Sequence, residues 1–249
     1  MILPVKILGI SASIRRSGNS EYLLKKALKA IENIDSNIFK TEIYSFTGKV
    51  LSPCLGCLSC LDFKDCILRD DFDEIKEKWL EADGIIYSVP VFHLGLPAHF
   101  KSFLDRLGQT AMAQYQDRLP RYMKVIGVIS QGTDLGGGAE LTAIQLITHA
   151  LVMGGIPVSG DPPESYIGAV GWTERSPLLD AIIRLEEKND INASTLIKAA
   201  ETLGKRVAYL SLIIKNGAYI TKDIIEKDLG YSLFLDKIKK EISKVNNQL

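Results

Sequence analysis

The sequence lacks any apolar run near the roughly 20 residues that a membrane-spanning helix requires. It also lacks net charge, because 30 Lys and Arg residues balance 30 Asp and Glu residues, which argues against a basic surface for nucleic acid. Its first residues, MILPVKILGISAS, lack a charged leader followed by a long apolar stretch and a small-residue cleavage site. These absences predict a cytoplasmic protein that binds neither nucleic acid nor a membrane.

Cysteine is scarce as well, and the four cysteines fall within thirteen residues: Cys54, Cys57, Cys60 and Cys66. In a reducing cytoplasm, clustered cysteines more often indicate metal or redox chemistry than disulfides. Two-residue gaps between thiolates are the spacing of bacterial ferredoxins, whose tight loop folds around a cubane, so one 4Fe–4S cluster would use all four. Zinc is an alternative, although four-cysteine zinc sites usually pair two C-x2-C knuckles across a longer loop.

Apolar runs alternate with amphipathic stretches along the chain, which is the pattern of βαβ units on a parallel sheet. Strands are predicted at residues 5–10, 39–46, 83–89, 123–129 and 156–159. Helices are predicted at residues 20–33, from 70 onward, and at 97–108, 139–153 and 194–214, the last ending at Asn216-Gly217. Residues 161–193 show no regular pattern, and 218–249 suggest one or two short helices. We expect Asp105 and Arg106 to belong to a charge network at a helix end.

The loop after the first predicted strand, SASIRRSGNS at residues 11–20, suits a dianionic phosphate. In an open parallel sheet, ligands bind beyond the carboxyl ends of the strands. This loop offers hydroxyls, an amide, two guanidinium groups and the free N–H groups of a helix N-terminus. It has neither the G-x-G-x-x-G nor the G-K-[ST] spacing, so a mononucleotide is favoured over a dinucleotide. The alternative is a polar turn in which Asn19 or Ser20 caps the helix.

Two further loops follow predicted strands and could together hold a planar ring. Residues 90–97 (PVFHLGLP) supply flat apolar surface, and the glycines of residues 130–138 (SQGTDLGGG) let backbone N–H groups approach a ligand closely. The alternative is that Phe92 belongs to the core and that the glycines serve a flexible surface loop.

Three segments together resemble the NAD(P)H-dependent FMN reductase family of flavodoxin-like proteins: ILGISASIRRSGNSEYLL, PCLGCLSCLDFKDCILRDDFDEI and EADGIIYSVPVFHLGLPAHFKSFLDR. Within that family, the compact cysteine motif is most similar to that of the iron–sulfur flavoproteins. The resemblance covers residues 5–210. It implies a flavodoxin-like α/β domain over residues 1–210, with the cysteine loop at 54–66. Residues 211–249 lie beyond the resemblance, and their apolar positions predict a helical appendage. The sheet would have five parallel strands in the order 2-1-3-4-5, with helices on both faces.

The resemblance also implies FMN as the cofactor and names the residues that would hold it. The phosphate would lie against Ser11, Ser13, Arg15, Ser17, Asn19 and Ser20. The isoalloxazine ring would lie against Pro90, Val91, Phe92, His93, Leu94 and Gly95, with its edge lined by Thr133, Gly136, Gly137 and Gly138. The 4Fe–4S cluster would be bound by the four cysteines, although many similar reductases without a cluster keep some or all of these cysteines as structural thiols.

The expected function is FMN-dependent electron transfer, from NAD(P)H or a ferredoxin-like donor to a small-molecule acceptor such as a quinone. No catalytic side chain is predicted, because hydride chemistry belongs to the cofactor. The resemblance further implies a homo-oligomer. Two alternatives remain: a cluster-free NAD(P)H-dependent FMN or quinone reductase, and a non-enzymatic redox carrier or sensor.

Overall fold

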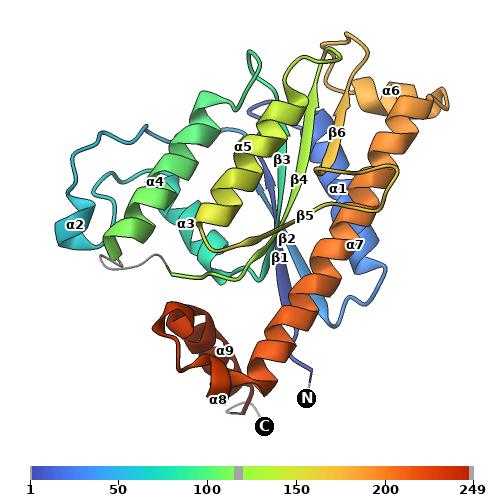
Figure 1. Ribbon diagram of the computed structural model, residues 1–249. Coiled ribbons are helices and arrows are strands. Elements are labelled where there is room, and N and C mark those ends of the chain that lie inside the picture. The colour runs from blue at the N-terminus through green and yellow to red at the C-terminus, as the bar shows by residue number, and fades with distance from the viewer. Residues whose placement is uncertain (1, 115–119, 247–249) are drawn as a thin grey trace.

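The computed structural model describes residues 2–114 and 120–246, and a parallel sheet crosses the molecule with helices on both faces (Figure 1). The strands are β1 (Val5–Ser11), β2 (Phe39–Ser45), β3 (Gly84–Pro90), β4 (Val125–Gly132), β5 (Ile156–Val158) and β6 (Ala169–Trp172). Their order is β2-β1-β3-β4-β5, and β6 also pairs with β4. The predicted α/β class and the order 2-1-3-4-5 are therefore confirmed.

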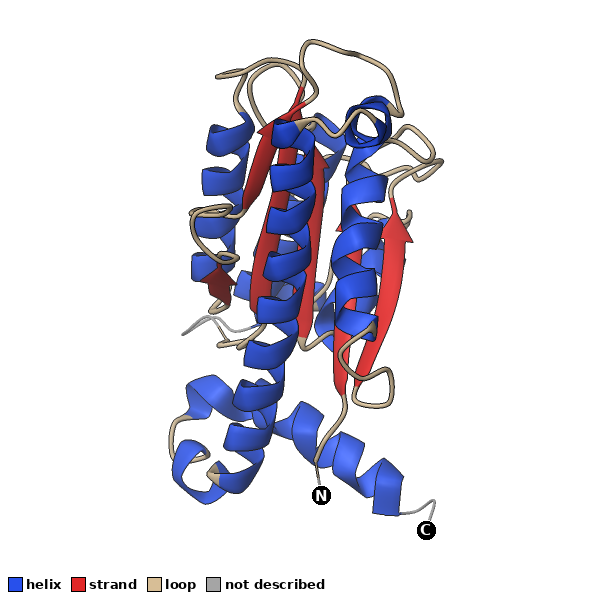
Figure 2. Ribbon diagram, turned by 90° about the vertical axis from the view of Figure 1, so that its right-hand side faces the viewer, coloured by secondary structure: helices blue, strands red, loops and turns tan. Residues whose placement is uncertain are grey.

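Two layers of helices sandwich the sheet (Figure 2). One layer contains α1 (Asn19–Glu32), α6 (Ala181–Glu187) and α7 (Ile191–Ile220), and the other contains α3 (Phe72–Glu81), α4 (Ala98–Gln114) and α5 (Ala139–Val152). The short α2 (Cys60–Phe63) lies in the cysteine loop, and α8 (Lys222–Ile225), the 3-10 helix η1 (Leu229–Tyr231) and α9 (Ser232–Asn246) form the C-terminal part. Within the ranges that the structure describes, no helix combines the length and apolarity needed to cross a bilayer.

The central strands are apolar on both faces because helices cover both. Every residue of β3 and β4 is buried, which explains why these strands are continuous apolar runs rather than alternating ones. On the α7 face, two glycines allow close packing of the helix. A Cβ at Gly84 would lie 2.5 Å from Ser211 Oγ, and one at Gly127 would lie 2.8 Å from Val207 Cγ2.

The structure differs from the expected elements in two places. Residues 161–193 contain β6 and α6, which were not predicted, and β4 pairs with β5 over residues 125–127 and with β6 over 129–132. The predicted helix end at Asn216-Gly217 is wrong, because α7 continues to Ile220. The Asn216 side chain is instead fixed by tertiary bonds: its Oδ1 accepts from Leu3 N (2.8 Å) and its Nδ2 donates to Leu3 O (3.2 Å).

The amino ends of the strands are closed by α9 through a buried group of charges, the basal ion cluster (Asp83, Lys124, Lys215, Lys237 and Glu241). Lys215 Nζ donates to Asp83 Oδ2 (2.8 Å) and pairs with Glu241 (2.6 Å), and Lys237 donates to the other Asp83 oxygen. Burial alone would oppose ionisation of Asp83, but Lys237 and Lys215 hold its pKa below the usual value. The cluster therefore ties α7 and α9 to the start of β3.

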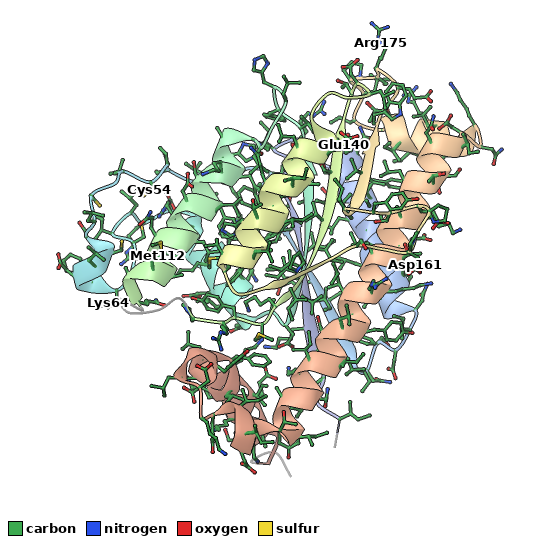
Figure 3. The ribbon with its side chains drawn as sticks, viewed as in Figure 1. Cys54, Lys64, Met112, Glu140, Asp161 and Arg175 are labelled. Carbon is green, nitrogen blue, oxygen red and sulfur yellow. The ribbon has the colours of Figure 1, made fainter. Side chains whose placement is uncertain are left out.

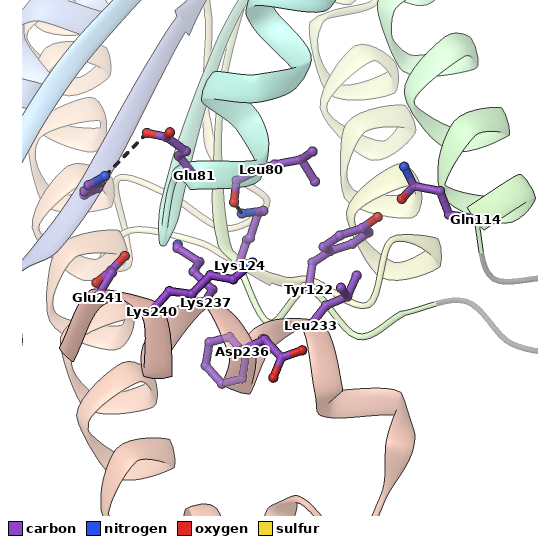
Figure 4. Close-up of a pocket in the computed structure, with 12 residues that line it drawn as sticks. Leu80, Glu81, Gln114, Tyr122, Lys124, Leu233, Asp236, Lys237, Lys240 and Glu241 are labelled. Atoms are coloured by element: carbon purple, nitrogen blue, oxygen red, sulfur yellow. Dashed lines mark hydrogen bonds and ion pairs between the residues drawn. The ribbon is translucent and has the colours of Figure 1, made fainter. Parts of the chain in front are cut away.

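A cavity of about 440 Å³ lies beside this cluster, between α9 and the sheet (Figure 4). Its inner wall includes Lys124, whose Nζ donates to Leu80 O (2.8 Å) and Ala82 O (2.6 Å). Burial lowers the pKa of Lys124 well below its usual value, and both of its hydrogen bonds go to backbone carbonyls rather than to a carboxylate. Because the buried lysines of this wall are already bonded within the protein, we interpret this end of the sheet as structural.

Candidate functional site

The loop between β1 and α1 leaves the start of a helix open at the carboxyl end of the sheet. The N-cap of α1 is Gly18, and no described side chain caps the helix. The first N–H groups of α1 are therefore available to an anion. Ser13 Oγ accepts from Arg15 N (3.1 Å) and donates to Arg15 O (3.0 Å), which folds the loop back on itself. His99 of α4 supports the same loop, since its Nε2 lies 2.7 Å from Ala12 O.

The predicted phosphate residues divide into an exposed and a buried group. Arg15 and Ser17 are exposed, and the remaining four are buried: Ser11, Ser13, Asn19 and Ser20. Asn19 uses both ends of its amide within the protein, since Nδ2 donates to Leu178 O (2.9 Å) and Oδ1 accepts from Ile182 N (3.0 Å). Ser11 Oγ is different, because it is buried without a hydrogen-bond partner among the described residues. A free donor thus lies where β1 enters the loop.

The segment between β6 and α6 borders this loop, and the sequence did not predict it as part of the site. Arg15 Nη1 donates to Pro177 O (3.0 Å), in addition to the bond from Asn19 to Leu178 O. Arg175, at the upper edge of Figure 3, lies on the same segment, and its N–H donates to Thr133 O (2.7 Å). Residues 161–193 showed no regular pattern in the sequence, and nothing local indicated which strand end this segment would meet.

The first ring loop forms a tight turn over residues 92–95. Phe92 N donates to Gly95 O (3.0 Å), and Gly95 N donates to Phe92 O (3.1 Å). Its central residues, His93 (φ 46°) and Leu94 (φ 70°), both lie in the left-handed region. That is the geometry of a type I′ turn, which favours Asn-Gly, so His-Leu at these positions is strained. The Phe92 and Leu94 side chains are 41% and 59% exposed, so the prediction that Phe92 could be core is not supported.

The glycine-rich loop packs directly against this turn. Gly138 has φ 101°, and a Cβ there would lie 2.5 Å from Leu94 O, so only glycine lets the two loops approach this closely. Gly136 is also in the left-handed region (φ 69°) and faces open space. Gly138 is the N-cap of α5 and, like Gly18, supplies no side-chain cap. The three predicted loops therefore follow β1, β3 and β4, which are neighbours in the sheet.

The four cysteines are unpaired and line one cavity of about 90 Å³ beside α4. Figure 3 labels Cys54, the first of them. Apolar side chains of the loop share the lining: Leu55, Leu58, Ile67 and Leu68. Burial raises the pKa of the Cys60 thiol, and the three other thiols raise it further, which indicates that they lie near it. A hydrogen bond from Ser59 lowers the pKa of the Cys57 thiol.

The expectation that Asp105 and Arg106 belong to a charge network at a helix end is wrong, because both lie in the interior of α4. The Arg106 side chain is 1% exposed, and its Nη1 donates to both oxygens of Asp70 (2.7 and 2.8 Å). Its Nε donates to Cys66 Sγ (3.3 Å). Asp105 turns outward and pairs with Lys101. Residues 100, 103, 104, 107 and 111 of α4 are also buried, so position 106 faces the cysteine loop rather than solvent.

Within the described part of the chain, no group of three or more His, Cys, Asp or Glu side chains is arranged to hold a metal ion, and this includes the four cysteines. A tetrahedral zinc requires four ligand atoms within about 2.3 Å of one point. A cubane instead distributes its four thiolates over four irons, so its ligands stand further apart.

Comparisons with known proteins agree over most of the chain. Residues 5–162 match the family model described as NADPH-dependent FMN reductase. An iron-sulfur flavoprotein of Archaeoglobus fulgidus is 35% identical over 199 residues, covering 80% of this chain and 97% of that protein. An iron-sulfur flavoprotein of Methanocaldococcus jannaschii is 35% identical over 213 residues, covering 85% of this chain and 100% of that protein.

Solved structures agree in fold. The flavodoxin, WrbA-like protein from Agrobacterium tumefaciens matches with a TM-score of 0.53 at 18% identity, covering 83% of this chain and 97% of that one. At this identity the likeness concerns the fold alone.

Proposed function

Since the chain belongs to the NADPH-dependent FMN reductase family, as its motifs predicted, and is therefore a flavin-dependent oxidoreductase, we propose that it holds FMN across the three loops at the carboxyl ends of β1, β3 and β4. When bound, FMN supplies the redox chemistry of the reaction. The observation that carries this proposal is the uncapped start of α1 beside the exposed Arg15. The residues of the chain would bind and orient the cofactor and shield its ring.

The phosphate would be held by the β1–α1 loop. The N–H groups at the start of α1, the hydroxyl of Ser17 and the guanidinium of Arg15 offer donors to a dianion. Ser13 would shape the loop, because its hydroxyl already donates to Arg15 O. The unpartnered Ser11 Oγ adds a donor at the base of the loop. Asn19 and Ser20 would act by positioning, because the Asn19 amide is bonded to its neighbours and Ser20 Oγ accepts from Gln131 Nε2 (3.1 Å).

The ring would lie against the turn at residues 90–95, where the exposed Phe92 and Leu94 provide apolar surface. Its edge would face the loop from Thr133 to Gly138. The N–H groups at the start of α5 place partial positive charge there, which would favour uptake of electrons by the ring. Gly136 and Gly137 would let the backbone approach the ring closely.

The four cysteines would bind a 4Fe–4S cluster. They are unpaired, they line one cavity, and the two-residue gaps between the first three follow the ferredoxin spacing, which favours a cluster over zinc. Two relatives of this chain carry the name iron-sulfur flavoprotein. Unpaired thiols also suit the reducing cytoplasm that we propose as the compartment.

The cluster would exchange single electrons with a partner. NAD(P)H or a ferredoxin-like protein would be the electron donor, and a quinone-like molecule would be the acceptor.

A homo-oligomer is proposed from the outer face of α5. Four apolar side chains on this helix are exposed at helical spacing: Leu141, Ile144, Leu151 and Val152. A stripe of this kind is typical of an interaction surface. We propose that a second copy of the chain covers it, and light scattering that reports a monodisperse monomer at working concentration would overturn this. Residues 211–249 would form an appendage to the flavin domain of residues 1–210.

The binding test compares FMN with riboflavin, which lacks the phosphate. Arg15→Gln should weaken FMN binding about 10-fold or more, because a charge-assisted bond is lost, and should leave riboflavin binding unchanged. The matched control is Arg184→Gln, which removes an exposed guanidinium of α6 that pairs with Asp180. Calorimetry that detects no heat with FMN, on protein that stays colourless, would reject the proposal.

The redox alternatives are separated by a second experiment. Iron, zinc and flavin are quantified on one anaerobically purified sample, together with its visible spectrum. Flavin without iron would support a cluster-free reductase. Oxidation of NADPH with and without ferredoxin then separates an enzyme from a carrier, since a carrier should turn over negligible nicotinamide.

A further inference from the structure

Arg106 connects both ends of the cysteine loop to α4. Before the loop, Ser52 O accepts from Nη1 (3.3 Å), and after it Leu68 O accepts from Nη2 (2.9 Å) and Asp70 accepts from Nη1. Asp70 extends this network, since its carboxylate also accepts from Ser52 N (2.9 Å). The guanidinium further stacks on Phe72, 4.2 Å from the ring centroid. The two ends of the loop are thus joined without any metal.

A further donor of this guanidinium, Nε, points at a cysteine. Arg106 Nε lies 3.3 Å from Cys66 Sγ, within hydrogen-bond range for sulfur. A buried guanidinium is a rigid donor, because its five N–H groups share one plane and four other contacts fix that plane. Cys54 and Cys57, at the other end of the motif, are exposed. The motif is therefore asymmetric, with Cys66 fixed and the first two cysteines open to solvent.

We propose that Arg106 positions the cysteine loop before a cluster binds and then raises the reduction potential of that cluster through its hydrogen bond to Cys66. The inference rests on the proposed cluster. Reduction adds one electron, supplied by an external donor, and so adds one negative charge to the cluster. A hydrogen-bond donor on a ligand sulfur stabilises the more negative state more strongly, and such contacts are known to tune clusters. Asp70 opposes the effect, because its carboxylate partly neutralises the guanidinium.

Arg106 and Asp70 carry opposite charges, so removing each charge should shift the midpoint potential of the cluster in opposite directions. Arg106→Gln should shift the midpoint potential of the reconstituted cluster to more negative values, because the cation and its donor are removed. Asp70→Asn should shift it to more positive values, because Arg106 stays while its counter-charge is lost. Arg106→Lys keeps the charge without the planar fork, so its potential should lie between those of the wild type and Arg106→Gln. Potentiometric titration with dithionite, followed by visible or paramagnetic resonance spectra, measures all four proteins.

The matched control is Arg69→Gln. Arg69 lies next to the same loop but is 65% exposed and pairs with Asp73, so solvent screens its charge. Its removal should shift the potential less than Arg106→Gln does. Bound FMN, quantified in every variant, should stay at the wild-type level. The hydrogen bonds of Arg106 go to residues 52, 66, 68 and 70, which belong to none of the three flavin loops.

The positioning role is measured without any cluster. In the metal-free protein, hydrogen exchange over residues 52–70 should be about 10-fold faster or more in Arg106→Gln, because charge-assisted bonds that hold the loop are lost. Iron should also be lost about 10-fold more readily to a competing chelator. Unchanged exchange would overturn the positioning role, and equal potentials in wild type, Arg106→Gln and Asp70→Asn would overturn the tuning.

The absence of a cluster and the absence of tuning by Arg106 would give different experimental results. Wild-type protein that takes up no iron on anaerobic reconstitution would overturn both the cluster and the tuning of it. Iron uptake by the wild type with variant potentials that do not move would overturn the inference alone.

Discussion

At the amino ends of the strands, the charges of the basal ion cluster are mostly buried and bonded to one another, whereas at the carboxyl ends the two arginines of the β1–α1 loop are exposed. Asp83, Lys215 and Lys237 form ion pairs under α9. Arg15 and Arg16, at the other edge, lie in an exposed loop beside a helix start that no described side chain caps. This difference in burial and bonding indicates that a ligand would bind at the carboxyl edge. Charges that satisfy one another hold the fold together, and donors left without protein partners can meet a ligand.

Non-glycine residues with positive φ are more frequent at the carboxyl edge than at the amino edge, where Met123 before β4 has φ 53°. The loops at the carboxyl edge contain several non-glycine residues with positive φ: Ser17, His93, Leu94, Glu174 and Arg175. Such residues are held in place only by the surrounding structure, and they are often found at functional sites. Substitutions at the amino edge should therefore affect mainly the stability of the fold, and those at the carboxyl edge mainly cofactor binding.

Removing the central carboxylate of the basal ion cluster should damage the fold. Asp83→Ala should lower the free energy of unfolding by about 3–5 kcal/mol, because it leaves two buried ammonium groups without their shared partner. Urea denaturation measures this, and the control is Glu81→Ala, whose carboxylate is 72% exposed and should cost at most about 1 kcal/mol. Because the pKa of Asp83 is lowered in the fold, its contribution is present above the usual carboxyl pKa and is lost as pH falls through the lowered value. Equal losses in both variants would contradict the contrast.

The acid sensitivity of the fold should come partly from the last turn of α5. Burial lowers the pKa of His149 from 6.5 to about 4, so the unfolded chain binds more protons than the folded one between those values. The free energy of unfolding should therefore decrease as pH falls from 6.5 to 4, by at most about 3 kcal/mol from this residue. His149→Gln should remove that part of the slope in urea denaturation at a series of pH values. His93→Gln, at the exposed ring loop, should keep it, and an unchanged slope in His149→Gln would contradict the assignment.

Substitution where the two ring loops meet should weaken cofactor binding rather than the core. Gly138→Ala should weaken both FMN and riboflavin binding about 10-fold or more, because a Cβ clashes with Leu94 O and the φ of 101° costs about 1–3 kcal/mol in any other residue. Gly108→Ala, in open space on α4, is the control for calorimetric titration. FMN binding equal to that of the wild type would show that the ring lies elsewhere.

The smallest expected effect is a gain of stability far from the flavin loops. Gly217→Ala should raise the free energy of unfolding by about 0.5–1 kcal/mol, because Gly217 lies inside α7 with open space around its Cβ position. Chemical denaturation measures the change, and FMN affinity should not move. A loss of stability would instead indicate the helix end that the sequence suggested.

The strands and the three loops could be predicted because their signals are local. Buried parallel strands leave continuous apolar runs, such as residues 84–90, and the carboxyl-end rule then brings their loops together. Gly217 was misread because tertiary bonds between Asn216 and Leu3 outweigh the helix-stop signal. Strand β6 has four residues, and it pairs with β4 beyond the point where β5 ends, which no local pattern encodes.

The role of Arg106 was beyond the reach of the sequence for a similar reason. Asp70 is its ion-pair partner at a separation of 36 residues, and the loop that brings them together has little regular structure. A charged residue in an amphipathic helix is usually solvated, so the buried position becomes evident only when the cysteine loop is seen against α4.

The divided edge of the sheet has a consequence for how this protein can associate. Beside β4 the hydrogen-bonding groups are taken up by two short strands in succession, β5 and β6, instead of one long strand. At the opposite margin, β2 presents Lys40 and Glu42 as exposed charges. Short and charged margins resist the addition of a foreign strand. Copies of this chain should therefore meet helix to helix, and continuous fibrils built by sheet extension should not form from the native state.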